Sequence, residues 1–295
     1  MNRRISPFLI LLAAIMWGTT GTTQAFAPDA AHPIAIGATR LAIGGLFLLI
    51  MLIILGQLNV KNWSVRLTVL ATLSMAVYQP LFFSAVSLTG VAIGTVVAIG
   101  SAPILSGVIE WLFQKKRPTK VWVYATIVSI VGCTILFANK DSLFIHPLGI
   151  ALALGAGLSF AIFTIVSRDL VKKHSSLPVM AVVFTLSGIC LSPFLFLFDM
   201  SWVTSFRGMG VSLYLGIVAT AIAYLLFAKG LVYVSSSTAV ALSLAEPLTA
   251  TLLGVFLLGE YLHTTAWFGI SLLLVGIGIL VRSSNDDGGS RQVMN

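Results

Sequence analysis

Residues Ser235–Glu260 read SSSTAVALSLAEPLTATLLGVFLLGE, which is long and apolar enough to cross a lipid bilayer as a helix. Glu246 nevertheless lies near its middle and is followed at once by Pro247. A charged residue at the centre of a membrane-spanning helix costs roughly 2.5–3.5 kcal/mol on insertion scales. A proline also leaves the carbonyl four residues earlier, that of Ser243, without its helical donor. Both groups need polar surroundings inside the membrane, so the stretch predicts one wall of a solute cavity.

The composition of the whole chain is that of a polytopic membrane protein. Of its 295 residues, 58% are hydrophobic and only 9% are charged, and the mean hydropathy is +1.04. Soluble domains of this size do not have such a composition. Apolar and polar residues do not alternate at strand period, which argues against a barrel. Cys133 and Cys190 fall within apolar runs and are predicted to be free thiols.

Ten apolar runs predict an all-α integral membrane fold with ten transmembrane helices. The connections between them are short, so neighbouring helices are expected to be antiparallel. The predicted runs are 6–27, 33–56, 65–88, 91–113, 119–138, 147–169, 177–198, 209–232, 236–258 and 263–281.

The distribution of positive charge predicts the orientation in the membrane. Of the 17 lysines and arginines, only Lys140 and Arg207 fall in connections on the side opposite the N-terminus, and Arg40 lies inside a run. The positive-inside rule therefore places both termini in the cytoplasm, in a cell (inner) membrane protein. Arg3-Arg4, the first run and Ala25-Phe26-Ala27 mimic a signal peptide. We expect this run to be retained, because cleavage would leave nine helices and break the symmetry described next.

The chain divides into two five-helix halves, residues 1–140 and 147–282, followed by a cytoplasmic tail, 283–295, expected to be disordered. Displacing the first half by 144 positions places Pro103 on Pro247 and residues 91–94 on 235–238. The two halves share few identical residues, so the evidence is a shared pattern. An odd number of helices per half predicts inverted repeats, a recurring design of secondary transporters with the substrate site at the midplane.

Several short motifs, in order along the chain, resemble one family. They are Trp17-Gly18, Arg40, Tyr224, Lys229-Gly230-Leu231, Glu246-Pro247 and Gly259-Glu260. Together with the two halves, they resemble an EamA-type transporter of the drug/metabolite transporter superfamily, over nearly the whole chain. The resemblance implies a ten-helix carrier of bacterial or archaeal type, and many such relatives export amino acids or other small metabolites. The first half departs from the second, with Ala102-Pro103 in place of Glu246-Pro247 and Lys116 in place of Glu260.

Polar and aromatic residues at middle depth predict a cavity lined by the first, third, fourth, sixth, eighth and ninth helices. Tyr78-Gln79-Pro80 marks a second polar point, expected to be broken by proline. A serine or threonine at this depth is more often bonded to its own helix. Gln79 and Glu246 favour the cavity, because their desolvation costs more. The residues at this depth are Trp17, Gln79, Ser101, Ser159, Thr220, Tyr224 and Glu246. For substrate binding, aromatic walls are predicted from Trp17, Tyr78, Phe160 and Tyr224, and Gln79, Ser101 and Glu246 are predicted to orient an amine or similar polar group.

Five residues are candidates for coupling or gating: Arg40, Pro103, Lys229, Glu246 and Pro247. One hypothesis is a Lys229–Glu246 ion pair that breaks during transport. The other is that Glu246 carries a proton. Lys229 has an alternative role as a cytoplasmic anchor whose stem snorkels to the membrane face. For Arg40, a structural role is favoured over contact with an anionic substrate group.

The remaining motifs have structural interpretations. Glu110-Trp111 predicts an interface anchor paired with Lys115 or Lys116, and Glu260 is placed at the outer rim. Gly90 and Gly94 form a G-x-x-x-G, and further glycines line the sixth run at positions 149, 155 and 157. They predict close helix approach, by default within the monomer, with sliding of the halves or a dimer as alternatives.

The sequence therefore predicts a secondary active transporter that works by alternating access and exports amino acids or related amphipathic solutes. Its partners would be a small-molecule substrate and the lipid bilayer, with no nucleic acid; proton coupling and the choice between monomer and homodimer are open. Enzyme signatures are missing and the four histidines are dispersed, so no cofactor and no metal site are predicted. The alternatives are a flippase of a lipid-linked headgroup and a non-transporting membrane sensor or scaffold.

Overall fold

The computed structural model describes residues 3–57, 63–115, 117–137, 146–259 and 263–290, and these residues form helices and short connections only. Proline at the first or second helical position starts α1, α2 and α5. The helices are α1 (Ser6–Ala25), α2 (Pro33–Ile54), α3 (Val65–Gln114), α4 (Lys120–Phe137), α5 (Pro147–Val171), α6 (Ser176–Leu197), α7 (Phe206–Leu213), η3 (Tyr214–Ile222), α8 (Ala223–Leu231), α9 (Ser236–Leu242), α10 (Ala245–Leu258) and α11 (Thr264–Ser290), with short 3-10 turns η1 (Arg3–Ile5) and η2 (Ser201–Thr204).

The predicted ten-helix membrane fold is confirmed. Within the described residues, nine segments are long and apolar enough to cross a membrane, and Lys120–Leu136 is a shorter apolar helix. Phe206–Leu231, the eighth crossing, contains α7, η3 and α8. The middle part, η3, is a π-helix. The last helix continues to Ser290, beyond the expected end at residue 281.

The third and fourth crossings closely match the predicted runs 65–88 and 91–113, and the backbone between them is helical. They form the single helix α3, within which Val65–Thr89 and Gly94–Gln114 are each long and apolar enough to cross a membrane. The chain must reverse between them, because a Cβ added to Gly94 would lie 3.0 Å from the Cα of Val86. Pro80 and Pro103 both lie inside α3. The predicted break at Pro80 is therefore wrong.

The predicted break at Pro247 is present. The ninth crossing divides into α9 and α10 at Ser243 and Leu244, and Glu246 lies in the first turn of α10. Pro247 cannot donate to the carbonyl of Ser243, and that carbonyl instead accepts a hydrogen bond of 2.9 Å from the N–H of Glu246. The acid is thus held at a helix start in the middle of a membrane crossing.

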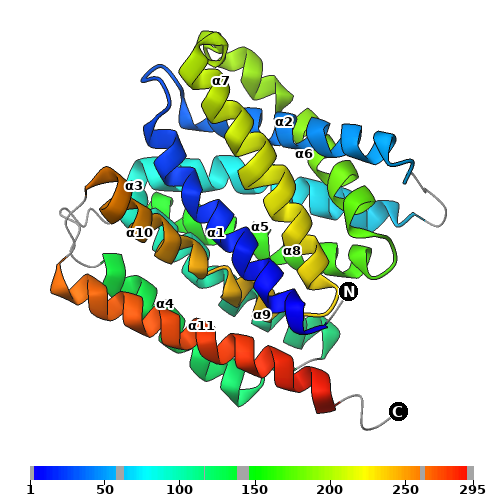
Figure 1. Ribbon diagram of the computed structural model, residues 1–295, viewed down its shortest axis with the longest axis vertical. Helices are drawn as coiled ribbons and strands as arrows, with labels where there is room; N and C mark the ends of the chain where they lie inside the picture. The colour runs from blue at the N-terminus through cyan, green and yellow to red at the C-terminus, as the bar shows by residue number, and fades with distance from the viewer. Residues whose placement is uncertain (1–2, 58–62, 116, 138–145, 260–262, 291–295) are drawn as a thin grey trace.

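Helices of each half pack against helices of the other half (Figure 1). The first helix of each half packs against the third and fourth crossings of the other: α1 lies against α8 and α10, and α5 lies against α3. The corresponding helices α2 and α6 pack together, as do α4 and α11. Glycines permit the closest approaches. For example, a Cβ on Gly18 would lie 2.5 Å from Cβ of Thr249 and 2.7 Å from the carbonyl oxygen of Glu246.

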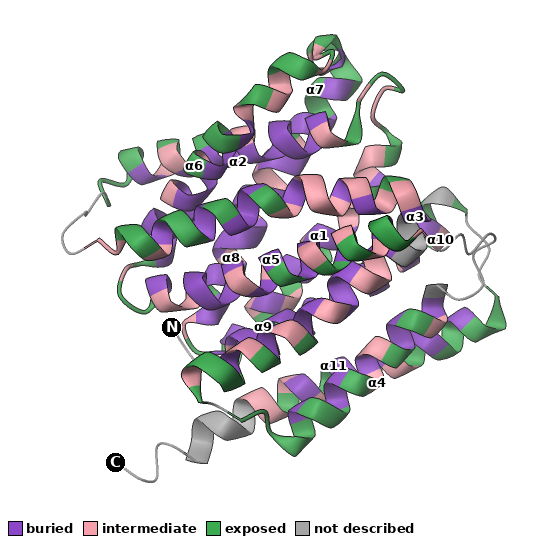
Figure 2. Cartoon of the chain, turned by 180° about the vertical axis from the view of Figure 1, so that it is seen from behind, coloured by how far each residue is buried: buried purple, intermediate pink, exposed green. Residues whose placement is uncertain are grey.

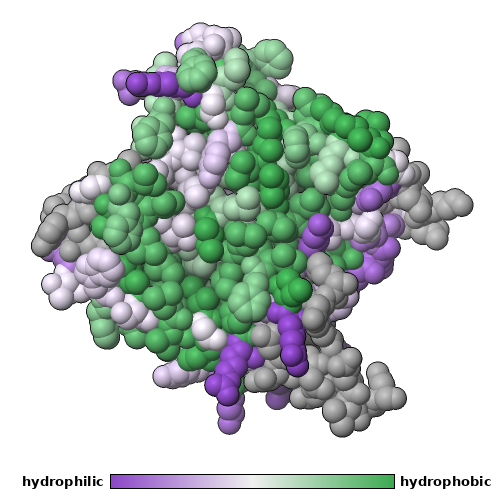
Figure 3. All heavy atoms as spheres, viewed as in Figure 1, coloured by the Kyte–Doolittle hydropathy of each residue, from purple (hydrophilic) through white to green (hydrophobic). Residues whose placement is uncertain are grey.

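The outer surface is suited to lipid. Large exposed hydrophobic side chains occur on most of the helices, and the outward faces of α4 and α11 are largely exposed (Figure 2). The face in Figure 3 is mostly hydrophobic, with strongly hydrophilic residues mainly toward its margin. This pattern is expected of a protein whose central belt is surrounded by the hydrocarbon of a lipid bilayer.

Candidate functional site

One cavity of about 540 Å³ penetrates the bundle from one end. Its lining comes from the C-terminal half of α1, the N-terminal half of α2, the region of α3 around its reversal, and α10. It reaches exposed Ala25 and Pro33 at the rim, so it opens at the end where α1 stops and α2 starts. Pockets of 300–1,000 Å³ suit small organic ligands.

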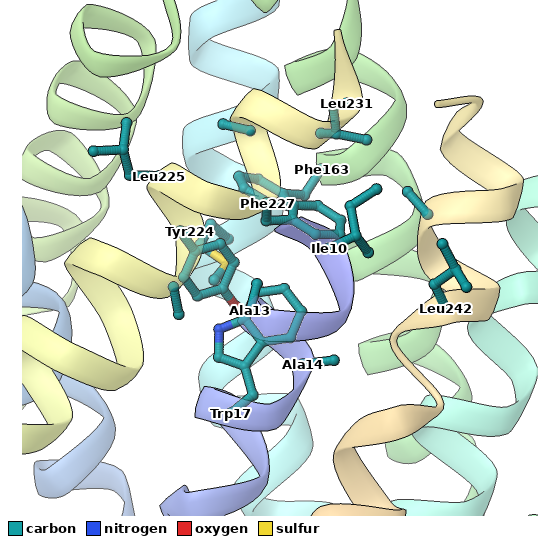
Figure 4. Packing of buried hydrophobic residues seen from close by; sticks show 14 of the residues in the cluster. Ile10, Ala13, Ala14, Trp17, Phe163, Tyr224, Leu225, Phe227, Leu231 and Leu242 are labelled. Carbon is teal, nitrogen blue, oxygen red and sulfur yellow. The ribbon is translucent and has the colours of Figure 1, made fainter. Parts of the chain in front are cut away.

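Aromatic rings close the inner end of the cavity and form what we call the aromatic floor: Trp17, Phe160, Phe163, Tyr224 and Phe227. Trp17 is central, with ring centroids 4.6 Å from Tyr224, 5.1 Å from Phe227 and 5.9 Å from Phe160. Figure 4 shows Trp17, Tyr224 and Phe227 meeting beside Ile10. Phe163 and Phe227 are fully buried and belong to the hydrophobic core beneath the cavity. The floor offers ring faces and edges to an apolar or aromatic group.

Two groups of opposite charge line the cavity. Arg40 comes from α2 and is 8% exposed. Its Nε donates to Oγ1 of Thr220 at 3.0 Å, and its Nη2 donates to the carbonyl of Ala219 at 3.4 Å. Both acceptors, one a side-chain hydroxyl and the other a backbone carbonyl, belong to the π-helix η3. Glu246 comes from the α10 side, against α1.

Several polar atoms of the cavity-lining residues have no hydrogen-bond partner within the described part of the chain. They are Nε1 of Trp17, Oγ1 of Thr20, Nε2 of Gln24 and Nε2 of Gln79. Gln79 is only 2% exposed, and its Oε1 would lie 3.4 Å from a Cβ on Gly37, one turn before Arg40. A buried polar group without a partner is destabilising by about 1–3 kcal/mol. A bound solute or water would satisfy these donors.

Most of the predicted substrate residues meet in this cavity. They are Trp17, Tyr78, Gln79, Phe160, Tyr224 and Glu246, joined by Pro247 and Arg40. Arg40, for which the sequence favoured a structural role, lines the cavity. It also has a structural role, because its two hydrogen bonds hold α2 against η3.

Three of the predicted residues do not line the cavity. Ser101 donates to the carbonyl of Ala98 and packs against Gly157 of α5. Pro103 is buried inside α3. Lys229 is exposed near the end of α8, and the described residues contain no ion pair between it and Glu246. The Lys229–Glu246 pair is therefore not formed in this structure.

Serine and threonine at middle depth mostly bond their own helices, which was the favoured interpretation for single residues of this type. Ser159 donates to Gly155, and Thr220 donates to the carbonyl of Leu215, five residues back, while accepting from Arg40. The glycines of α5 also have the expected packing role, because Gly149 approaches Thr89 and Gly157 approaches Ser101.

Sequence reasoning missed the polar face of α1 and the role of Glu110. Thr20, Gly21 and Gln24 follow Trp17 at helical spacing, so the period alone was enough to find them. Glu110 is not an interface anchor: it is 4% exposed and bonds to the start of α9. Its partner Ser236 lies 126 residues away along the chain, so no local sequence pattern predicts this contact. Lys116 and Glu260 lie outside the described residues.

Comparisons with known proteins agree with this architecture. The model of the EamA-like transporter family matches the chain twice, over residues 4–138 and 147–282. A Bacillus subtilis (strain 168) protein, named the uncharacterized transporter YwfM, is 50% identical over 280 residues that cover 95% of both chains. The uncharacterized inner membrane transporter YicL of Salmonella typhimurium is 24% identical over 279 residues, which is 91% of this chain and 92% of the relative.

A protein of known crystal structure superposes with a TM-score of 0.84 over 97% of this chain and 99% of the other, at 19% identity. That likeness concerns the fold. Fold, cavity and relatives together define a multi-pass membrane transporter. The chain belongs to the EamA-like transporter family, which confirms the resemblance drawn from its motifs.

Proposed function

We propose that this protein is a secondary active carrier that exports amino acids or closely related amphipathic zwitterions by alternating access. It would lie in the cell (inner) membrane with both termini in the cytoplasm, since positive charge concentrates on the side of the N-terminus. In that orientation the cavity opens to the outside, and the aromatic floor separates it from the cytoplasm.

The observation that carries the proposal is that a basic residue, Arg40, and an acidic residue, Glu246, line the same cavity above the aromatic floor. Arg40 and Gln79 supply N–H donors on the side of α2 and α3, and Glu246 supplies a carboxylate on the side of α10. A planar guanidinium matches a carboxylate, and a buried carboxylate matches an ammonium group. A solute with both groups and an apolar side chain would satisfy all three surfaces at once.

The role of Glu246 in coupling follows from the same geometry. Lys229 is exposed, so the proton-carrier hypothesis has more support than the ion-pair hypothesis. We propose that the carboxyl group of Glu246 holds either a proton or the ammonium group of the solute. Competition between the two would couple solute export to proton entry.

The test uses thermal stabilisation of the detergent-purified protein by three matched ligands. Phenylalanine carries both charged groups, phenethylamine lacks the carboxylate, and 3-phenylpropanoate lacks the ammonium. We expect phenylalanine or another apolar amino acid to raise the unfolding temperature saturably, because the ligand binds the folded state. Removing either charged end should weaken binding by about tenfold or more, as expected for a lost charge-assisted bond.

Two variants assign the ends of the ligand. Arg40→Gln should abolish the preference for phenylalanine over phenethylamine, and Glu246→Gln should abolish the preference over 3-phenylpropanoate. Arg207→Gln, at an exposed residue of the first turn of α7 that does not line the cavity, is the control and should change neither preference. If no amino acid stabilises the protein or shows saturable flux in liposomes, the proposed substrate class is wrong, and the flippase and sensor alternatives regain priority.

A further inference from the structure

A second polar cluster lies at the closed end of the bundle, away from the cavity. Glu110 near the end of α3 is 4% exposed and accepts three hydrogen bonds from the start of α9. The donors are the N–H of Ser236 at 3.0 Å, the N–H of Ser237 at 3.3 Å and the hydroxyl of Ser237. Nη1 of Arg168, in the last turn of α5, lies 3.9 Å from the same carboxylate. We name Glu110, Arg168, Ser236 and Ser237 the carboxylate clasp.

The clasp joins both halves of the protein. Glu110 belongs to the first half, whereas Arg168 and the two serines belong to the second. The carboxylate accepts from the first N–H groups of α9, which have no acceptor within their own helix. Hydrogen bonds to a charged acceptor are stronger than neutral ones, and burial strengthens them further. The contact is thus a strong polar link between elements that are otherwise held together by apolar packing.

The position of the clasp relates it to access. Ala102 lines the cavity from α3. One turn further along α3, Ser106 is fully buried, and one more turn leads to Glu110. The cavity has no lining residue beyond Ala102 on this arm of α3. The clasp therefore lies between the base of the cavity and the end of the bundle that carries the N-terminus.

The inverted repeat identifies the matching positions at the open end. The displacement of 144 that places Pro103 on Pro247 also relates Gln24 to Arg168 and Glu110 to Gly254. Gln24 and Gly254 both line the open cavity. Glu110 and Arg168 are therefore in contact at the closed end, whereas their equivalents Gly254 and Gln24 line the cavity at the open end. At the open end a glycine occupies the place of the carboxylate.

We propose that the carboxylate clasp is the lock that holds the closed end shut, and that Glu110 and Arg168 set the balance between the two access states. This inference rests on the proposed carrier function. When the carrier turns, the clasp separates and Gln24 approaches Gly254. Because that second contact lacks a carboxylate, the open end closes less firmly, and the resting protein favours the state described here.

The test measures both ends at once through introduced thiols. Cys133→Ala and Cys190→Ser remove the native thiols, one buried and one exposed. Gly21→Cys reports the open end, because Gly21 lines the cavity and a Cβ there meets no atom within 4 Å. Ser106→Cys, in a separate protein, reports the closed end. The rate of reaction with a small water-soluble maleimide is measured on the full chain in detergent, where reagent reaches both ends.

Glu110→Gln should raise the reaction rate of the thiol at position 106 by about tenfold or more and lower that of the thiol at position 21. The reason is that the clasp loses its charged acceptor, so its hydrogen bonds hold the closed end less strongly. Ser237→Ala removes one donor and should produce a smaller shift in the same direction. Asp169→Asn is the matched control: it neutralises a more exposed acid beside Arg168, 4.0 Å from Lys172. It should leave both rates unchanged.

A second design tests the lock from the other end. Gln24→Arg combined with Gly254→Glu installs the missing charges where the open end would close. It should protect the thiol at position 21 and expose the thiol at position 106, although no residue of the clasp has been changed. Local unfolding near Glu110 cannot produce that result.

Two results would overturn the inference. One is that the thiol at position 106 becomes reactive while the thiol at position 21 keeps its rate, which is local loosening without a change of state. The other is that Glu110→Gln and Ser237→Ala both match the Asp169→Asn control. None of these rates requires a substrate. Reciprocal thiol shifts without amino acid binding would therefore preserve the lock and reject only the proposed substrate class.

Discussion

At the scale of single residues, the site shows how an acid is accommodated at mid-membrane. Glu246 lies in the first turn of α10, where the partial positive charge of a helix N-terminus favours a carboxylate. It also faces a cavity that water can enter from the exposed rim. A location of this kind offsets part of the roughly 2.5–3.5 kcal/mol that insertion scales assign to a charge in hydrocarbon. The residue is therefore placed for exchange with solvent and solute.

Replacing Glu246 by glutamine is expected to abolish the pH dependence of transport in liposomes and to slow transport at least about tenfold, through loss of a charge-assisted bond. Asp199→Asn is the control. The N–H and hydroxyl of Ser201, each 2.8 Å away, hold the pKa of Asp199 below its usual value, so this exposed acid stays ionised as pH falls toward that value. A pH profile that survives Glu246→Gln would remove Glu246 from coupling.

At the scale of the element, equivalent helices of the two halves behave differently around equivalent prolines. The ninth crossing is interrupted before Pro247, whereas α3 continues through Pro103. The interruption puts Pro247 in the first turn of α10, where a proline is tolerated because its N–H is not needed. It is this broken crossing, and not the continuous one, that carries the acid.

Pro247→Ala should lower transport while leaving the unfolding temperature unchanged or a few degrees higher. Alanine supplies the missing N–H, and a continuous helix would then turn Glu246 away from its present position. Pro193→Ala is the control, since Pro193 is an exposed proline inside α6 that does not line the cavity. Full transport by Pro247→Ala would show that the break is dispensable. Flux in liposomes and thermal unfolding in detergent are the two measurements.

At the scale of the whole molecule, neither half can complete its own core. α1 buries Ile10, Ala13 and Trp17 in one cluster with Tyr224 and Phe227 of the other half. In return, α5 lies along α3. The hydrophobic core of each half is thus completed by the first helix of the other half.

Fragments 1–140 and 147–282 should therefore be unstable when expressed separately and should form a complex when expressed together. Size-exclusion chromatography and thermal unfolding in detergent measure both properties, with the intact chain as reference. The apolar and glycine-mediated contacts of α1 with α8 and α10 supply the association. A monodisperse, folded fragment 1–140 on its own would contradict this arrangement.

The sequence was sufficient for the features that depend on local pattern. Hydropathy gave the ten crossings, and Glu246-Pro247 gave the break and its place beside a cavity. Features that depend on contacts across the chain were not accessible in this way. Glu110 looked like an interface anchor because its partners on α9 are remote in sequence. The bracing role favoured for Arg40 agrees with its bonds to η3, but its place in the cavity could not be read from sequence, because it depends on the packing of α2 against η3.

The contact between Gly18 and Thr249 also has a consequence for biosynthesis. Roughly 230 residues separate the two positions, so at 5–20 residues per second about 10–50 s elapse before the ribosome has made both. During that interval α1 must remain in the bilayer without its final neighbours, although it is the least hydrophobic of the nine long crossings. We therefore expect newly inserted α1 to depend most strongly on a membrane insertase or chaperone that shields it until α8 and α10 are made.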